Sequence, residues 1–170
     1  MMDLKENGTI VHTAHGVGKI KGTTTKVIDG HKRLFFTVKT DKLTYWIPAK
    51  DPNTERIRKL RAPSTFQTVL SLIRKKPKKL SNNFRSRLKH LNKELAKCSL
   101  KANAILIRDL HGRNMEKSLH INESRIFEKL KKNFVREWAI SAGIVEEEAL
   151  GKLEEALSAS TQKTLEKSPQ

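Results

Sequence analysis

The first 50 residues alternate between short apolar runs and turn residues, which is the pattern of a small antiparallel sheet. Asp29-Gly30 separates two of these runs and is a strong signal for a two-residue hairpin turn. Asp41-Lys42 marks a further turn, and Pro48 ends the last run because it cannot continue a strand's hydrogen bonding. We therefore expect a barrel-like or strongly bent β domain without helices. The runs rich in β-branched and aromatic residues are residues 8–13, 17–28, 34–38 and 43–47.

Beyond about residue 61 the apolar residues recur every three or four positions, which predicts helices. Ser64 and Gln67 have the spacing of a capping box at the start of the first helix, and Pro77 is expected to end it. Asn122 is expected to cap a longer helix that stops at Gly143. The expected helices begin near residues 64, 83, 102, 122 and 146.

The change of period near Arg61 divides the chain into two predicted domains. Residues 1–61 are expected to form the antiparallel β domain, and residues 62–158 an all-α domain, so that the fold class is α+β. The composition turns polar after the last helical pattern, and residues 159–170 are therefore expected to be a disordered tail.

The net charge of +17 points to a polyanionic partner, of which nucleic acid is the commonest. Residues 62–144 hold 19 Lys and Arg against 6 Asp and Glu, a balance of +13, whereas residues 1–61 carry 13 against 6, or +7. A nucleic-acid surface is therefore expected mainly on the helical domain. A membrane surface is the weaker alternative, because no long apolar run lies opposite a basic face.

The sequence shows no sign of secretion or of a familiar catalytic or metal centre. A single cysteine, Cys98, allows no intramolecular disulfide, and no run has the length of a signal peptide or membrane span, so we expect a cytoplasmic protein. His15-Gly16-Val17-Gly18 lacks the Lys-Ser/Thr ending of a phosphate loop and is interpreted as a turn. The histidines and Cys98 do not have zinc-ligand spacing. We expect a protein that is not an enzyme and binds no metal or cofactor.

Phe84 and the cations beside it form the most informative local cluster for DNA binding. An aromatic residue at a helix start, flanked by Arg85, Arg87 and Lys89, can face a phosphate backbone and wedge into a minor groove. The pattern alone also fits a Phe84 that packs in the core, which is the commoner place for such a residue. The basic run 74–79 is interpreted as a set of further phosphate contacts.

Several motifs resemble a known family of transcription regulators. His12-x-x-His15-Gly16-Val17-Gly18 and Leu43-Thr44-x-x-Ile47-Pro48 resemble the RNA polymerase-interacting domain shared by CarD, CdnL and transcription-repair coupling factor. Asn83-Phe84, Arg108-Asp109-Leu110 and Glu123-x-Arg125 resemble the C-terminal domain of CarD and CdnL. The resemblance spans about residues 8–157, and the order and spacing of the motifs make it specific.

The resemblance implies a Tudor-like β domain that binds the β subunit of RNA polymerase. It also implies a helical domain that contacts promoter DNA at the upstream edge of the transcription bubble, where an aromatic wedge stabilises the open complex. Phe84 occupies the wedge position, which is typically Trp in the family. The positions implied for the polymerase contact are Lys26, Ile28 and Trp46, and Trp46 stands where family members often carry Arg.

Together these features predict a bacterial, monomeric adaptor that regulates transcription initiation by binding RNA polymerase and promoter DNA, largely without sequence specificity. One alternative is a structural RNA- or DNA-binding protein, associated with the ribosome or the nucleoid, for which the charge is equally suitable. An enzyme that acts on nucleic acid is a further alternative, and it would require an acidic or metal-binding cluster.

Overall fold

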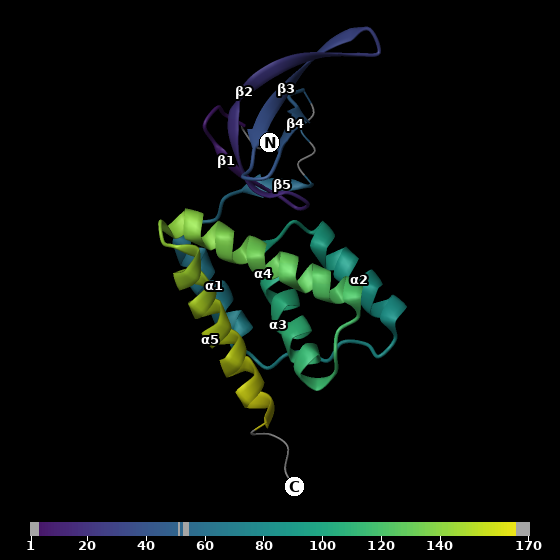
Figure 1. Ribbon diagram of the computed structural model, residues 1–170, viewed down its shortest axis with the longest axis vertical. Coiled ribbons are helices and arrows are strands. Elements are labelled where there is room, and N and C mark those ends of the chain that lie inside the picture. Colours follow the sequence, from purple (N-terminus) through teal and green to yellow (C-terminus); the bar gives the residue numbers. More distant parts are fainter. Residues whose placement is uncertain (1–3, 51, 53–54, 166–170) are drawn as a thin grey trace. The chain divides into compact units, whose positions relative to one another are not determined.

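In the computed structural model, residues 1–60 and residues 61–170 form two compact units. The structure describes the backbone of residues 4–50, 52 and 55–165, and the side chains of the same residues as far as 162. The first unit is an antiparallel sheet and the second is a group of helices (Figure 1). The predicted α+β fold with a β domain followed by a helical domain is confirmed.

The β domain is one open antiparallel sheet with the strand order β4-β3-β2-β1-β5. The runs predicted from the sequence supply β1 to β4. The fifth strand, which was not predicted, is short and basic, and it is ordered by pairing with β1. The strands are β1 (Thr9–His12), β2 (Gly16–Ile28), β3 (His31–Lys39), β4 (Thr44–Pro48) and β5 (Ile57–Lys59).

The hairpin between β2 and β3 turns at the predicted Asp29-Gly30. Both residues have positive φ, 52° and 75°, as a type I′ turn requires. Strand β4 pairs with β3 over residues 35–39, and Ala49 donates one further hydrogen bond to the Leu34 carbonyl, so residues 26–28 and 31–33 have only each other as strand partners within the described chain. This end of the hairpin therefore extends beyond β4 as a two-stranded arm (Figure 1).

One face of the sheet carries the core of the β domain. Ile20, Val38 and Ile47 lie on this face and are buried with Leu4, Ile10 and Ile57. Gly18 allows the close approach of β2 to this core, because a Cβ at this position would lie 2.6 Å from Val38 Cγ1. Gly16 has a φ of 71° where the turn that ends at His15 enters β2, so the motif His15-Gly16-Val17-Gly18 leads from a turn into a strand rather than into a helix.

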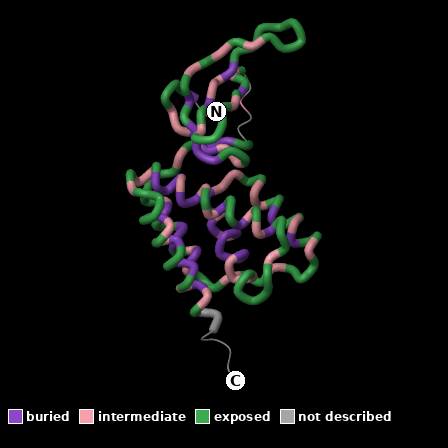
Figure 2. Tube along the Cα trace, in the orientation of Figure 1, coloured by how far each residue is buried: buried purple, intermediate pink, exposed green. Residues whose placement is uncertain are grey.

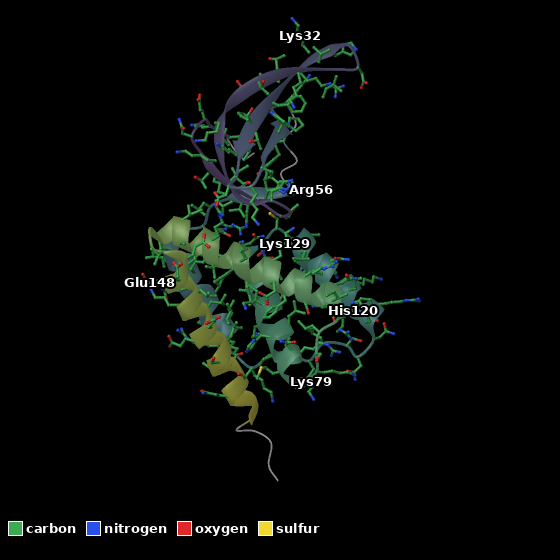
Figure 3. The ribbon with its side chains drawn as sticks, in the orientation of Figure 1. Lys32, Arg56, Lys79, His120, Lys129 and Glu148 are labelled. Atoms are coloured by element: carbon green, nitrogen blue, oxygen red, sulfur yellow. The ribbon has the colours of Figure 1, made fainter. Side chains whose placement is uncertain are left out.

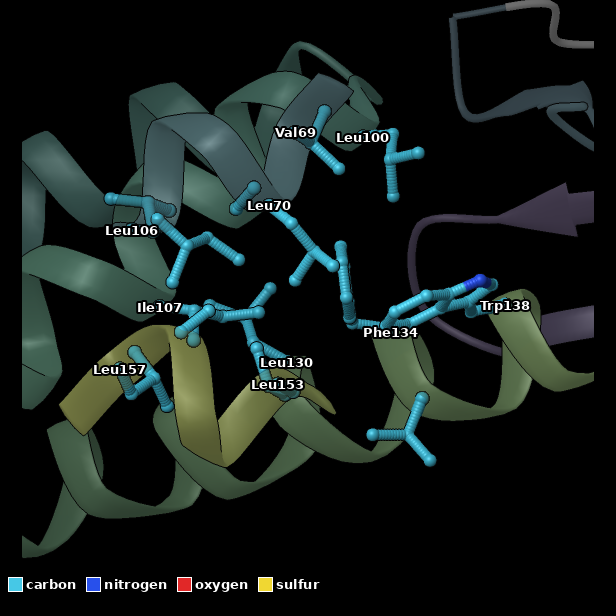
Figure 4. Packing of buried hydrophobic residues seen from close by; sticks show 14 of the residues in the cluster. Val69, Leu70, Leu100, Leu106, Ile107, Leu130, Phe134, Trp138, Leu153 and Leu157 are labelled. Atoms are coloured by element: carbon cyan, nitrogen blue, oxygen red, sulfur yellow. The ribbon is translucent and has the colours of Figure 1, made fainter. Parts of the chain in front are cut away.

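The helical domain surrounds one hydrophobic core to which α1, α3, α4 and α5 contribute most of the side chains (Figure 4). The Trp138 ring stacks on Phe66 with 5.8 Å between ring centroids, and both side chains are fully buried. Within the described chain, no helix is long and apolar enough to cross a membrane. The helices are α1 (Pro63–Ile73), α2 (Phe84–Ala96), α3 (Leu100–Glu116), α4 (Ile121–Ala142) and α5 (Glu146–Leu165).

Two predicted helix caps are wrong, and the predicted stop at Gly143 is confirmed. Helix α1 begins after Ala62 and has no side-chain cap, because the alanine side chain has no atom that could accept a hydrogen bond. Helix α4 begins one residue before Asn122, and His120 is its N-cap. Gly143 ends this helix in the left-handed conformation, with a φ of 66°.

Residues 159–165, which the sequence predicts to lie in a disordered tail, are helical. Helix α5 continues to Leu165, and Ser160 in this stretch is fully buried. Leu153, Ala156 and Leu157 precede it at helical spacing on the same buried face, which keeps the helix against the core despite its polar composition (Figure 2). Residues 166–170 lie outside the described residues.

Candidate interaction surfaces on the two domains

The three predicted polymerase-contact residues lie on one face of the β domain. Trp46 on β4 pairs with Thr37, and Phe35, two residues away on β3, pairs with Thr24. Directly paired residues and alternate residues along a strand share a face, so Trp46 and Phe35 lie on the same side of the sheet. Lys26 and Ile28 continue this series along β2. We call the surface made by Lys26, Ile28, Phe35 and Trp46 the Trp46 face.

The Trp46 face is opposite the β core and is held together by a cation–π contact. The Nζ atom of Lys26 lies 3.0 Å from the centroid of the Trp46 ring. Trp46 remains 45% exposed, whereas Phe35 on the same face is buried although it is not part of the β core. The face therefore presents a large apolar side chain with a cation beside it. Tryptophan is among the residues that contribute most to binding in protein interfaces.

In the helical domain, Phe84 is the first residue of α2 and lies outside the hydrophobic core. Its ring is half-buried and packs against His120, with 4.3 Å between the ring centroids. Asn83 is the N-cap of α2, and its side chain accepts a hydrogen bond of 3.0 Å from the backbone N–H of Ser86. The two neighbouring cations Arg85 and Lys89 are exposed.

Arg87 does not belong to this exposed set, which corrects its prediction as a DNA contact. Its side chain is buried, and its Nε and Nη2 atoms donate to the two carboxylate oxygens of Glu123 at 2.6 and 3.2 Å. Its Nη1 atom donates to the carbonyls of Ser81 and Asn82, both at 2.9 Å. Arg87 is four residues before the buried Leu91, and this spacing turns it toward the domain interior.

The buried carboxylate of Glu123 is stabilised in its charged form. Burial by itself would raise the pKa of Glu123, but hydrogen bonds from Arg87 and from the His120 backbone N–H oppose this effect. The positive charges of Arg87 and Arg113 act in the same direction, and the net result is a pKa below the ordinary value. Glu123 therefore joins the start of α4 to the start of α2 through an ion pair.

The basic segment between α1 and α2 is fixed to α3 through its backbone. The N–H of Lys78 donates to Asp109 Oδ1 at 2.8 Å, and Asp109 is itself buried in an ion pair with Arg108. Gly112 leaves room for the Pro77 ring, with which a Cβ would collide. This segment, one residue of which is labelled in Figure 3, borders a groove of about 690 Å³. Its exposed cations are Lys75, Lys76, Lys78 and Lys79.

His120 is the site residue that the sequence interpretation missed. Glu123 lies three residues after it and forms the second half of a capping box. This spacing was the available signal, but the first position of such a box is usually Ser or Thr rather than His. Within the described residues, no group of three or more His, Cys, Asp and Glu side chains could hold a metal ion.

Comparison with known families accounts for both domains. Residues 4–61 match the family described as "CarD-like/TRCF RID domain", and residues 68–154 match "CarD, C-terminal domain". The chain belongs to the CarD/CdnL family. This family is associated with transcription and interacts with RNA polymerase. The last turns of α5 in this CarD-family protein, residues 155–165, extend beyond the matched region.

Proposed function

We propose that this CarD-family protein is a monomeric, non-enzymatic regulator of transcription initiation. Its Trp46 face binds the β subunit of RNA polymerase. The start of α2 and the basic segment before it bind promoter DNA at the edge of the melted region. Because the two domains are linked, polymerase binding raises the local concentration of the DNA-binding domain, so weak DNA contacts suffice. These contacts change the lifetime of the open complex.

The position of Phe84 outside the hydrophobic core carries the DNA-binding part of this proposal. A phenylalanine that served the core would lie among the side chains of the helical cluster, as Phe66 and Phe127 do. Phe84 instead lies at the surface with Arg85 and Lys89 beside it. An apolar ring among cations is suited to a kinked or unstacked base step, because the ring replaces lost stacking while the cations contact phosphates.

The polymerase-binding part is supported by the match of the β domain to the family's interacting domain and by the geometry of the Trp46 face. Trp46→Ala is expected to weaken binding to purified polymerase β subunit about 30-fold, because large anchor residues contribute about 2 kcal/mol or more on truncation. Biolayer interferometry with the full-length variant measures this change. Leu34→Ala is the matched control, since Leu34 is exposed on the opposite face of β3. Equal weakening by both variants would contradict the assignment.

The affinity for duplex DNA is expected to fall steeply with salt, because phosphate contacts release counterions. Six exposed cations imply a slope of about −5 in a plot of log affinity against log salt. Lys79→Gln should make the slope shallower by about 1. Lys152→Gln should leave it unchanged, because Lys152 pairs with Glu148 on α5. Fluorescence anisotropy over a salt series measures the slopes. The six cations are Lys75, Lys76, Lys78, Lys79, Arg85 and Lys89.

The experiment that tests the whole proposal is the decay of open complexes after a competitor challenge. Bacterial RNA polymerase and a promoter are incubated with and without the full-length protein, and the remaining complexes are counted over time. The expected result is a severalfold longer lifetime in the presence of the protein. An unchanged lifetime, together with tight DNA or RNA binding and no affinity for polymerase, would instead favour a structural nucleic-acid-binding protein.

A further inference from the structure

A second aromatic residue, His120, lies beside Phe84 at the proposed DNA contact. We propose that His120 is a second nucleic-acid-contacting residue, and that the His120 and Phe84 rings together form a platform for a base that is unstacked at the edge of melted DNA. This inference rests on the proposed function and adds a residue from a different helix to the contact. Figure 3 marks His120 at the start of α4.

The two rings pack against one another as one aromatic unit. Their centroids are 4.3 Å apart and their planes are inclined by 41°, so the rings are in contact while facing somewhat different directions. His120 is exposed and Phe84 is partly buried. Aromatic side chains in such positions stack on unpaired bases of any sequence, because every base has a π-face. The imidazole covers part of the phenylalanine ring and, because His120 is exposed, offers its own outer face to a base.

The imidazole is oriented by the helix that it caps. Its Nδ1 atom accepts a hydrogen bond of 3.3 Å from the backbone N–H of Asn122, and its own backbone N–H donates to Glu123 Oε2 at 3.0 Å. With Nδ1 as the acceptor, the proton of the neutral ring resides on Nε2. Nε2 can therefore donate to a phosphate or to a base edge while the ring carbons contact the base.

The support beneath the platform is rigid and charged. The Arg87 guanidinium lies 5.8 Å from the Phe84 ring centroid and is bound to Glu123, the residue that also caps the His120 backbone. One buried ion pair therefore fixes the two helix ends that carry the two rings. Arg85 and Lys89 supply the exposed positive charge that a nucleotide's phosphate requires.

The test uses the full-length protein and a premelted DNA fork that carries 2-aminopurine at the junction. His120→Asn removes the ring but keeps a good N-cap, since Asn is among the preferred residues at this position. We expect about fivefold or greater loss of affinity for the fork, and loss of the fluorescence quenching that reports stacking of the 2-aminopurine. His120→Phe should retain the quenching. His31→Asn, an exposed histidine of the β domain, is the matched control and should behave as the parent protein.

Phe84→Ala is measured in parallel to separate this inference from the proposed function. If Phe84→Ala loses affinity and quenching while His120→Asn keeps both, His120 is only a helix cap and the inference is wrong, although the proposed function survives. If neither variant changes either signal, the DNA contact proposed at the start of α2 is wrong as well. Thermal unfolding of each variant shows whether it is folded. If His120→Asn is unstable, the affinity and quenching of His120→Phe provide the test instead.

Discussion

Replacement of Glu123 by alanine is expected to destabilise the helical domain by about 3–5 kcal/mol, because it leaves the Arg87 guanidinium buried without its partner. Glu123 is fully buried, and Arg87 is 5% exposed. Trp138 lies in the core of the same domain, so its fluorescence during urea unfolding in a Trp46→Phe background reports this domain alone. The matched control is Glu128→Ala, which removes a solvent-exposed ion pair with Lys131 and should cost at most about 1 kcal/mol. Similar losses for the two variants would contradict a dominant role for the buried pair.

The same ion pair gives the helical domain a defined dependence on acid. The pKa of Glu123 in the folded protein lies below its ordinary value of 4.5. Its contribution is therefore fully present above that ordinary value and is lost as the pH falls through the lower, folded-state pKa. Glu123→Gln should lack this contribution. The difference in unfolding free energy between the parent and Glu123→Gln should accordingly shrink as the pH is lowered below 4.5, which urea titrations at several pH values measure.

Phe84→Ala is expected to abolish the effect on open-complex lifetime while leaving the fold nearly intact. Its ring contacts His120 at the surface and is not part of the hydrophobic core. Phe66→Ala is the matched comparison, because it truncates a fully buried phenylalanine and should cost about 3–5 kcal/mol. Phe84→Trp should keep or strengthen the effect, since the larger ring offers more contact with an unstacked base step.

The measurements for Phe84 are paired. Thermal unfolding of each variant shows whether the domain is intact, and decay of the open complex after a competitor challenge shows whether it acts. Binding of the variants to polymerase should be unchanged, because the Trp46 face is not altered. A Phe84→Ala protein that unfolds would show that the ring is structural. If Phe84→Ala is folded and still has its full effect on open-complex lifetime, Phe84 does not act as the wedge.

The strand and helix types follow from the periodicity, whereas the ends of the elements depend on tertiary contacts that the pattern does not contain. Strand β5 has only three residues, too few to show a period, and it is ordered by pairing with β1 and by burial of Ile57. Helix α5 continues past Ser160, which is fully buried although the local composition is polar. His120 caps α4 through a ring nitrogen, which simple capping patterns do not anticipate.

The candidate site residues could likewise be predicted only in part from the sequence. Lys26 and Trp46 could be proposed from the resemblance, and the strand register then places them on one face with a direct contact. Arg87 was predicted to be a DNA contact because its neighbours are basic. Its burial depends on Glu123, a residue 36 positions away, and no local pattern reveals that two charged side chains meet inside the domain.

The attachment of the basic segment before α2 has a kinetic consequence. Its backbone is bonded to Asp109 at Lys78 and to Arg87 at Ser81 and Asn82 before any ligand arrives. A segment already held in place loses little conformational entropy on association, and it requires no folding step after the first encounter with DNA. Mixing of the protein with excess DNA in a stopped-flow instrument should therefore give a single relaxation whose rate rises linearly with DNA concentration.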